Sequence, residues 1–290
     1  MKNTAMRSTD ESNKKNQTNR SLKDIRLLAS DMDGTLLNDN REITLRTQDA
    51  IRKWVASGRF FVPTTGRPLC AMGKVDPLFD KDMLYIVYNG AMAVMHRSKE
   101  VLFSVTLAPA LVPEVYQLGN ERDVPIIIWC RDELYVNKDC EESRLYMEAT
   151  SAPFTVVKDN IELEKLAAAG VTKMLWIDSP EQVLVHQRDM QAHFGDKINC
   201  HASRPELFEF VGNDASKAIA LETVIPKLGV SREEIAAVGD GYNDLSMLRY
   251  AGYSIAMGNA PADIQAECDH VTLANNEDGV AVWMEEIMSL

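Results

Sequence analysis

Residues 25–35 read Ile-Arg-Leu-Leu-Ala-Ser-Asp-Met-Asp-Gly-Thr, a short apolar run followed at once by two aspartates and a glycine. The run 25–30 is typical of a strand in a parallel sheet whose two faces are both covered. Alternation along a strand turns Asp31 and Asp33 to the same side, and Gly34 lets the backbone turn sharply after them. The stretch therefore predicts two carboxylates in one small volume at the end of a buried strand.

Apolar strands that end in polar residues recur along the chain. Strands predicted at 60–62 and 85–88 end in Thr64-Thr65-Gly66-Arg67 and in Asn89-Gly90, and the helix predicted before them stops at Gly58. The C-terminal third continues the pattern with these predicted elements: helix 217–225, strand 235–238, a helix opening near Asn243, strand 253–257 and helix 280–287. This alternation predicts an α/β fold with a doubly wound parallel sheet, whose active site lies beyond the carboxyl ends of its strands.

The middle of the chain departs from this pattern. It offers candidate strands at 126–129, 134–136, 173–177 and 207–211, and helices near 141–150 and 181–194. Because the alternation resumes afterwards, we interpret the middle as an α/β domain inserted over the ligand edge of the sheet. The predicted organisation is a flexible tail at 1–22, a catalytic core at 23–90 and 211–290, and an inserted domain at 91–210.

The composition and net charge of the chain argue against several classes of function. The chain has 290 residues, 46% of them hydrophobic, and a formal charge of −12. That charge opposes sequence-independent binding to nucleic acid or anionic membranes, although a local positive site can still bind a small anion. No apolar run is long enough to span a membrane, and the five cysteines form no CxxC pair. We therefore expect a soluble cytoplasmic protein with reduced thiols.

The pair Asp31 and Asp33 has two interpretations when it is considered alone. An isolated Asp-x-Asp is common in a solvated turn or a helix cap. The apolar strand before the pair, and the polar motifs at other strand ends, favour a functional site instead. Two carboxylates this close repel each other unless a cation or a proton intervenes, so a metal ion is expected beside them.

Four motifs resemble those of the haloacid dehalogenase superfamily of phosphatases. The first is Asp31-Met32-Asp33-Gly34-Thr35, the second Thr65 before Gly66, the third Lys217, and the fourth Gly239-Asp240-Gly241-Tyr242-Asn243-Asp244. They occur in the expected order and span the chain from about residue 25 to its C-terminus. The long interval between the second and third motifs resembles the α/β cap of the Cof-like branch, known as type IIB, so the inserted domain is called the cap.

The resemblance implies a magnesium-dependent phosphatase that acts on small phosphorylated metabolites, mostly sugar phosphates in this branch. Asp31 would be the nucleophile that forms an aspartyl-phosphate. Asp33 would act as the general acid and then as the general base. Mg²⁺ would be bound by Asp31, by the backbone carbonyl of Asp33 and by Asp240, with Asp244 as a further or water-mediated support.

A second set of residues is expected to bind the transferring phosphoryl group. Lys217, at the start of a predicted helix, would neutralise charge, although a lone lysine is more often on the surface. Thr65 and the amide of Gly66 would donate hydrogen bonds, and Asn243 would orient the phosphate. Arg67 has two open interpretations: a contact with substrate, or a surface ion pair.

Two other functions compete with a phosphatase. A phosphosugar mutase would have to rebind a bisphosphate intermediate beneath the cap. A non-catalytic sensor of a phosphometabolite would keep the fold without turnover, but every expected catalytic position here holds a competent residue. The sequence leaves the physiological substrate, the cap residues that select it and the oligomeric state open.

Overall fold

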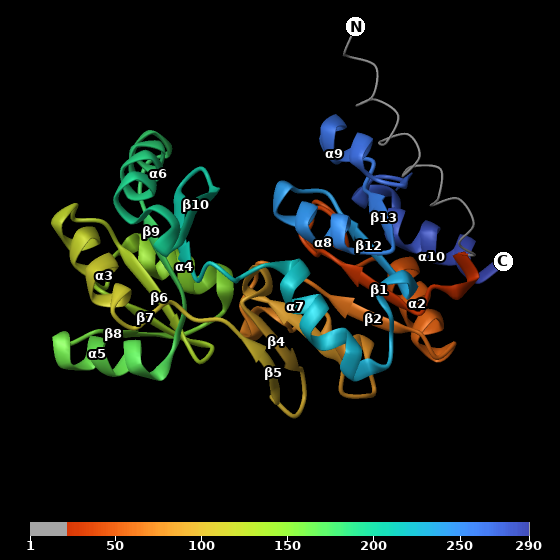
Figure 1. The fold of residues 1–290 in the computed structure, drawn as a ribbon, viewed down its shortest axis with the longest axis horizontal. Coiled ribbons are helices and arrows are strands. Elements are labelled where there is room, and N and C mark those ends of the chain that lie inside the picture. Colours follow the sequence, from red (N-terminus) through yellow and green to blue (C-terminus); the bar gives the residue numbers. More distant parts are fainter. Residues whose placement is uncertain (1–21, 290) are drawn as a thin grey trace, which may run out of the picture.

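A computed structural model describes residues 22–289 of the chain. Figure 1 shows two lobes with a strand hairpin between them. One lobe is built around a five-stranded sheet and the other around a six-stranded sheet, while a three-stranded sheet contains the hairpin. Most of the predicted tail, 1–22, lies outside the described residues; Leu22 begins a short 3-10 helix.

The five-stranded sheet is parallel throughout, in the order β14-β13-β12-β1-β2. Its strands are β1 (Leu27–Ser30), β2 (Phe60–Pro63), β12 (Ile235–Gly239), β13 (Tyr253–Ala256) and β14 (His270–Val271). Leu28 on β1 packs in the cluster that includes α2 (Leu45–Ala56) and α10 (Gly279–Ser289). Leu27 packs in the opposite cluster, with α7 (Lys217–Val224), α8 (Leu245–Tyr250) and α9 (Ala262–Glu267). Helices thus cover both faces, which confirms the predicted doubly wound sheet.

The strand predicted at 85–88 is present, but it pairs differently from the others. It is β3 (Leu84–Val87), and it pairs antiparallel with β4 (Met92–Met95), which pairs antiparallel with β5 (Val101–Ser104). An isolated parallel bridge between Thr64 and Ile86 joins β3 to the end of β2. β3 therefore lies beside the parallel sheet while it belongs to a separate hairpin.

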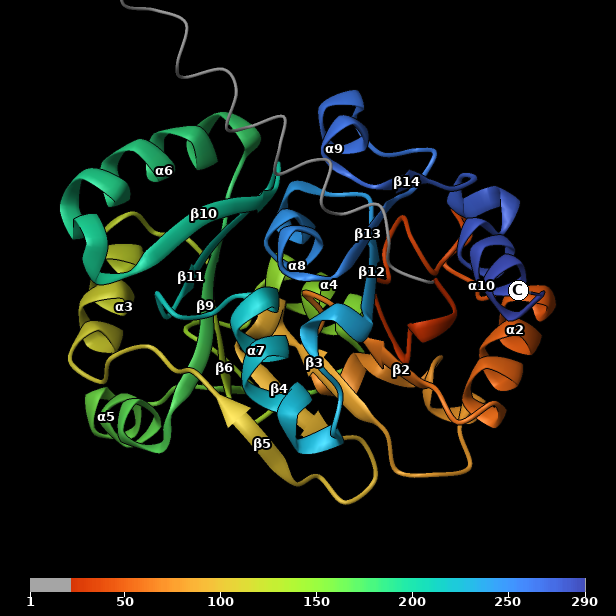
Figure 2. The same cartoon turned by 45° about the vertical axis from the view of Figure 1, so that its right-hand side comes forward.

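The six-stranded sheet has the order β10-β11-β9-β6-β7-β8. Its strands are β6 (Ile126–Cys130), β7 (Glu133–Val136), β8 (Phe154–Val156), β9 (Val171–Ile177), β10 (Asn199–Arg204) and β11 (Leu207–Val211). One face packs in the cluster that includes α3 (Leu111–Glu121), α5 (Asn160–Ala169) and α6 (Pro180–Phe194). The other face carries Trp129, whose indole donates to the hydroxyl of Tyr146 on α4 (Glu141–Thr150). Figure 2 shows this lobe from a second side.

Short 3-10 helices connect several of these elements. They are η1 (Leu22–Asp24), η2 (Leu69–Met72), η3 (Asp76–Leu78), η4 (Tyr88–Gly90), η5 (Gly195–Lys197), η6 (Ile225–Leu228), η7 (Arg232–Glu234), η8 (Tyr242–Asp244) and η9 (Asn275–Glu277). The division into core and cap stays a prediction. The pairing of β4 and β5 with β3 favours a first boundary after β5 rather than at residue 91.

Candidate active site

The polar motifs converge because their strands are parallel neighbours. β1 lies between β12 and β2, with Ser30 opposite Val238 on one side and opposite Pro63 on the other. The residues that follow these strands therefore leave the same edge of the sheet. Asp31, Asp240 and Thr65 are brought together at this edge, as the sequence predicted.

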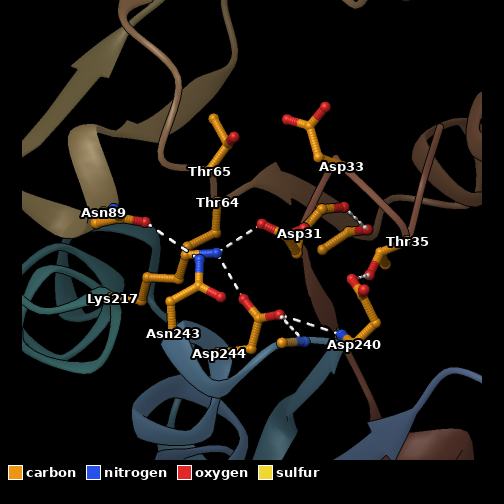
Figure 3. Close-up of polar contacts among 12 residues, drawn as sticks. Asp31, Asp33, Thr35, Thr64, Thr65, Asn89, Lys217, Asp240, Asn243 and Asp244 are labelled. Atoms are coloured by element: carbon orange, nitrogen blue, oxygen red, sulfur yellow. Dashed lines mark hydrogen bonds and ion pairs between the residues drawn. The ribbon is translucent and has the colours of Figure 1, made fainter. Parts of the chain in front are cut away.

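Lys217 is the centre of a buried polar cluster. Its Nζ lies 2.6 Å from Oδ1 of Asp31 and 2.6 Å from Oδ1 of Asp244 (Figure 3). The side chains of Lys217 and Asp244 are 1% exposed and that of Asp31 is 7% exposed. Lys217 is the first residue of α7, Asp244 is the last of η8, and Asp31 directly follows β1, so three segments meet at one point. Lys217 thus directly contacts the expected nucleophile, where its charge can act as predicted.

Glycine at position 90 makes this approach possible. Gly90 has φ +91°, and a Cβ there would come within 2.5 Å of the backbone nitrogen of Lys217 and closer still to Ser216. The backbone of η4 therefore lies directly against the start of α7. A side chain at this position would displace the helix that carries Lys217.

Three carboxylates at this edge could hold a divalent cation. One oxygen from each of Asp31, Asp240 and Asp244 lies within 4.8 Å of the others. Such an oxygen-only donor set suits a hard cation such as Mg²⁺. Asp244 also accepts hydrogen bonds from the backbone nitrogens of Asp240, at 3.1 Å, and Gly241, at 2.9 Å. Since both Asp244 oxygens already bind protein donors, the geometry favours the supporting role expected for it.

The charges of this cluster oppose one another. Burial raises the pKa of Asp31 to about 7, and the charge of Asp244 acts in the same direction, while Lys217 opposes them. Burial also raises the pKa of Asp240, although a hydrogen bond of 2.7 Å from Thr35 acts to lower it. Burial is the larger cause of both shifts, and the excess of carboxylate charge over the one ammonium of Lys217 adds to them. A cation among these oxygens would relieve that excess.

Asp33 points away from the cluster and pairs with Arg67. The guanidinium makes two hydrogen bonds to the carboxylate, Nε to Oδ2 at 2.7 Å and Nη2 to Oδ1 at 2.5 Å. Burial acts to raise the pKa of Asp33, but the hydrogen bonds and charge of Arg67 outweigh it, and the pKa is lowered. Arg67 is thus engaged in an ion pair in this structure, and its contact with substrate stays a prediction. The Asp33 side chain is likewise outside the carboxylate cluster, so its expected metal contact rests on its backbone carbonyl.

The remaining predicted residues surround the same edge. Thr65 is 1% exposed, and its Oγ1 accepts a hydrogen bond from the backbone nitrogen of Arg67. Gly66 follows it, and a Cβ on Gly66 would come within 2.8 Å of Oδ1 of Asn89. Asn243 donates to the same Oδ1 of Asn89 at 3.3 Å (Figure 3). Their roles toward a phosphoryl group stay predictions.

Two residues of the site were missed by sequence reasoning. Thr35 donates a hydrogen bond to Asp240, and Asn89 accepts one from Asn243. The signal for Thr35 was its place in the Asp-Gly-Thr motif. The signal for Asn89 was an Asn-Gly pair directly after a strand, where asparagine tolerates the left-handed conformation it adopts here, with φ 55°.

A cleft of about 900 Å³ opens above the carboxylates. Residues of both lobes line it: Asp31, Thr65 and Asn243 come from the five-stranded lobe, and Lys173 and Glu209 from the six-stranded lobe. A ligand in this cleft would therefore contact both lobes at once.

Comparison with known proteins places the chain in a family. Residues 28–284 match the family model of haloacid dehalogenase-like hydrolases. The chain belongs to this family. Two relatives from Bacillus subtilis (strain 168) are YxeH, 31% identical over 91% of this chain and 98% of that protein, and phosphatase YwpJ, 29% identical over 91% and 100%. The chain is accordingly a phosphatase.

Solved structures agree with this assignment. A haloacid dehalogenase-like hydrolase from Bacteroides thetaiotaomicron matches with a TM-score of 0.83 and 27% identity, over 91% of this chain and 99% of that one. The fold is also shared with BT4131, a sugar phosphatase of subclass IIB, with a TM-score of 0.76 and 23% identity over 91% and 100%. The family match confirms the predicted membership of the haloacid dehalogenase superfamily, and the Cof-like, type IIB branch within it stays a prediction.

Within residues 22–289, no helix combines the length and the apolar character needed to cross a membrane.

Proposed function

We propose that this phosphatase hydrolyses small phosphorylated metabolites, sugar phosphates among them, through a phosphoryl group carried on Asp31. The observation that carries the proposal is the buried contact of Lys217 with Oδ1 of Asp31. It orients one carboxylate oxygen, while no hydrogen-bond donor among residues 22–289 contacts the other, Oδ2. An oriented, buried carboxylate with one oxygen available is suited to attack on phosphorus.

The proposed reaction has two displacements at phosphorus. Asp31 attacks first, the bond to the ester oxygen breaks, and the departing alcohol takes a proton from Asp33. Water then loses a proton to Asp33 and attacks the same phosphorus, which releases phosphate and restores Asp31. Lys217 stabilises negative charge on Asp31 and on the phosphoryl oxygens in both steps. Thr65, Gly66 and Asn243 are proposed to orient those oxygens.

Mg²⁺ is proposed as the cofactor. Asp31, Asp240 and the carbonyl of Asp33 would hold it, with Asp244 in support, and when bound it would offset the charge of the phosphoryl group. The three carboxylates within 4.8 Å of one another support this choice.

Asp33 must leave Arg67 before it can transfer a proton. In the present arrangement both of its oxygens accept hydrogen bonds from the guanidinium. We propose that Arg67 turns toward the incoming substrate, because both side chains line the cleft and a phosphomonoester offers the guanidinium an equivalent anionic partner. Substrate entry would thereby free the general acid.

We propose that the binding partner of the protein is a small phosphorylated metabolite and that the protein is located in the cytoplasm. Five free thiols support the proposed location, because disulfides are rare in a reducing compartment: Cys70, Cys130, Cys140, Cys200 and Cys268.

Turnover of p-nitrophenyl phosphate with and without Mg²⁺ tests this function. We expect activity that requires Mg²⁺ and is abolished in Asp31→Asn. Asp80→Asn, a change of an exposed loop aspartate, is the matched control and should keep full activity. Wild-type protein that stays inactive with Mg²⁺ while it binds phosphate esters would contradict the proposal. Release of free phosphate from a sugar phosphate without a bisphosphate activator would exclude a mutase.

A further inference from the structure

A buried ion pair lies on the side of the six-stranded sheet that borders the cleft. Lys173 on β9 and Glu209 on β11 lie on neighbouring antiparallel strands, and Nζ of Lys173 is 2.9 Å from Oε1 of Glu209. Their side chains are 4% and 6% exposed. Both residues line the same cleft as Asp31. The pair therefore borders the active site from the lobe opposite the nucleophile.

Stability alone does not account for this pair. Removing two charges from water costs several kcal/mol each, and apolar residues of similar volume commonly stabilise a core as well or better. The surroundings would suit such a replacement, because Lys173 lies opposite the buried Trp129 and next to the buried Leu175. A buried pair of charges at the border of the cleft indicates a binding role.

The hydrogen bonds of Glu209 are unevenly distributed between its oxygens. Oε1 accepts from Lys173 and from the hydroxyl of Ser203, each at 2.9 Å. Within residues 22–289, no donor contacts Oε2, although that atom is buried. A buried acceptor without a donor costs about 1–3 kcal/mol, so a ligand that supplied one would recover that free energy. Ser203 also lines the cleft, which places the whole group at its border.

The chemistry of the pair selects a neutral polyol. The pair carries no net charge, so it favours neither a second anionic group nor an amine on the substrate. Two adjacent hydroxyls fit both residues, because one can donate to the carboxylate while the oxygen of the other accepts from the ammonium. Charge-assisted hydrogen bonds of this kind are stronger than those between neutral groups.

We propose that Lys173 and Glu209 form a subsite that binds adjacent hydroxyls on the leaving group of the substrate. The inference rests on the proposed phosphatase site, since it assumes that the phosphoryl group binds beside Asp31. It makes the two residues determinants of specificity: they select polyol phosphates over phosphate esters with an apolar chain.

The test compares two substrates that differ in their hydroxyls. Sorbitol 6-phosphate and n-hexyl phosphate share a six-carbon chain, and only the first carries adjacent hydroxyls. In the double variant Lys173→Met with Glu209→Leu, the ratio of kcat/KM for sorbitol 6-phosphate to that for n-hexyl phosphate should fall about 10- to 100-fold. Glu209→Gln keeps the shape of the side chain and should lower the same ratio. This variant tests the subsite even if the double variant does not fold.

The control is Arg144→Met, which removes an exposed ion pair with Asp139 on the same lobe. Its ratio should equal that of the wild type. A ratio unchanged in folded Glu209→Gln and in the double variant would overturn the proposal, and so would an equal loss for both substrates. Wild-type inactivity on both substrates would instead overturn the proposed function.

If the wild type is inactive on both substrates, calorimetric binding of sorbitol 6-phosphate still tests the subsite independently of turnover. Affinity weakened in Glu209→Gln relative to wild type would support the subsite, and equal affinity would overturn it.

Discussion

Replacing Gly90 by alanine should damage both the fold and the active site. Gly90 has φ +91°, where an alanine is strained by about 1–2 kcal/mol. The new Cβ would also come within 2.5 Å of the backbone nitrogen of Lys217, and relief of such overpacking costs about 1–3 kcal/mol more. The sum predicts a loss of about 2–5 kcal/mol in the free energy of unfolding.

The effect on activity follows from the same contact. To make room, the start of α7 must move, and Lys217 Nζ moves with it away from Asp31. A displacement of about 1 Å in a catalytic group can cost about 100-fold in rate. We therefore expect kcat/KM for p-nitrophenyl phosphate to fall by about two orders of magnitude in Gly90→Ala.

Gly58→Ala is the matched control. Gly58 has a similar φ of +86°, but a Cβ there would meet no atom within 4 Å. It shares the backbone strain without the contact, so it should lose about 1–2 kcal/mol of stability and keep wild-type kcat/KM. Urea unfolding and initial rates, measured where both variants are folded, separate the two effects. Equal activity in the two variants would refute the reasoning.

Three further predictions concern buried charges. Lys217→Met leaves Asp31 and Asp244 buried without their cation, so urea unfolding at pH 8 should show a loss of about 3–5 kcal/mol, and a loss under about 1 kcal/mol would contradict the ion pairs. Because the pKa of Asp31 in the folded protein, about 7, lies above its ordinary value of 3.8, the contribution of Asp31 to stability should fall as pH rises from 3.8 to 7 in the presence of EDTA. This dependence amounts to at most about 1.4 kcal/mol in the free energy of unfolding for each pH unit, and Asp31→Asn should remove it. An unchanged slope of stability against pH in Asp31→Asn would contradict the raised pKa of Asp31. Burial acts to raise the pKa of Glu209, but the charge of Lys173 outweighs burial and the pKa is lowered. Stability should therefore fall as acid protonates Glu209 below its ordinary pKa of 4.5, and Glu209→Gln should show a shallower fall in the free energy of unfolding measured from pH 6 to 3.

Much of the catalytic edge could be predicted from the sequence. Each motif follows an apolar strand, and parallel neighbours deliver their ends to one edge, so Asp31 and Asp240 had to meet once the alternation was recognised. A helix was also predicted to begin at Lys217, and α7 begins there.

Other features depend on contacts that a linear pattern does not contain. α3 was not predicted, because Pro113 and Gly119 weaken its helical signal. The structure shows why Gly119 is there: a Cβ would come within 2.7 Å of the indole nitrogen of Trp176. The pairing of Arg67 with Asp33 was likewise one of two open interpretations, because its choice depends on which anion is nearest in space.

The cap posed a similar limit. Lys173 and Glu209 are far apart in the chain, and each looks like an ordinary strand residue until β9 and β11 are paired. Their proposed role in specificity depends on the contact between the ammonium of Lys173 and the carboxylate of Glu209, which only the fold reveals.

Trapping the phosphoenzyme tests the central claim most directly. Protein quenched during turnover of a phosphate ester and treated with borohydride should carry homoserine at position 31, because borohydride reduces an acyl phosphate at that carboxylate. The reduced residue should be absent in protein quenched without substrate. Reduction at another carboxylate, or undiminished turnover by Asp31→Asn, would contradict the assignment of Asp31 as the nucleophile.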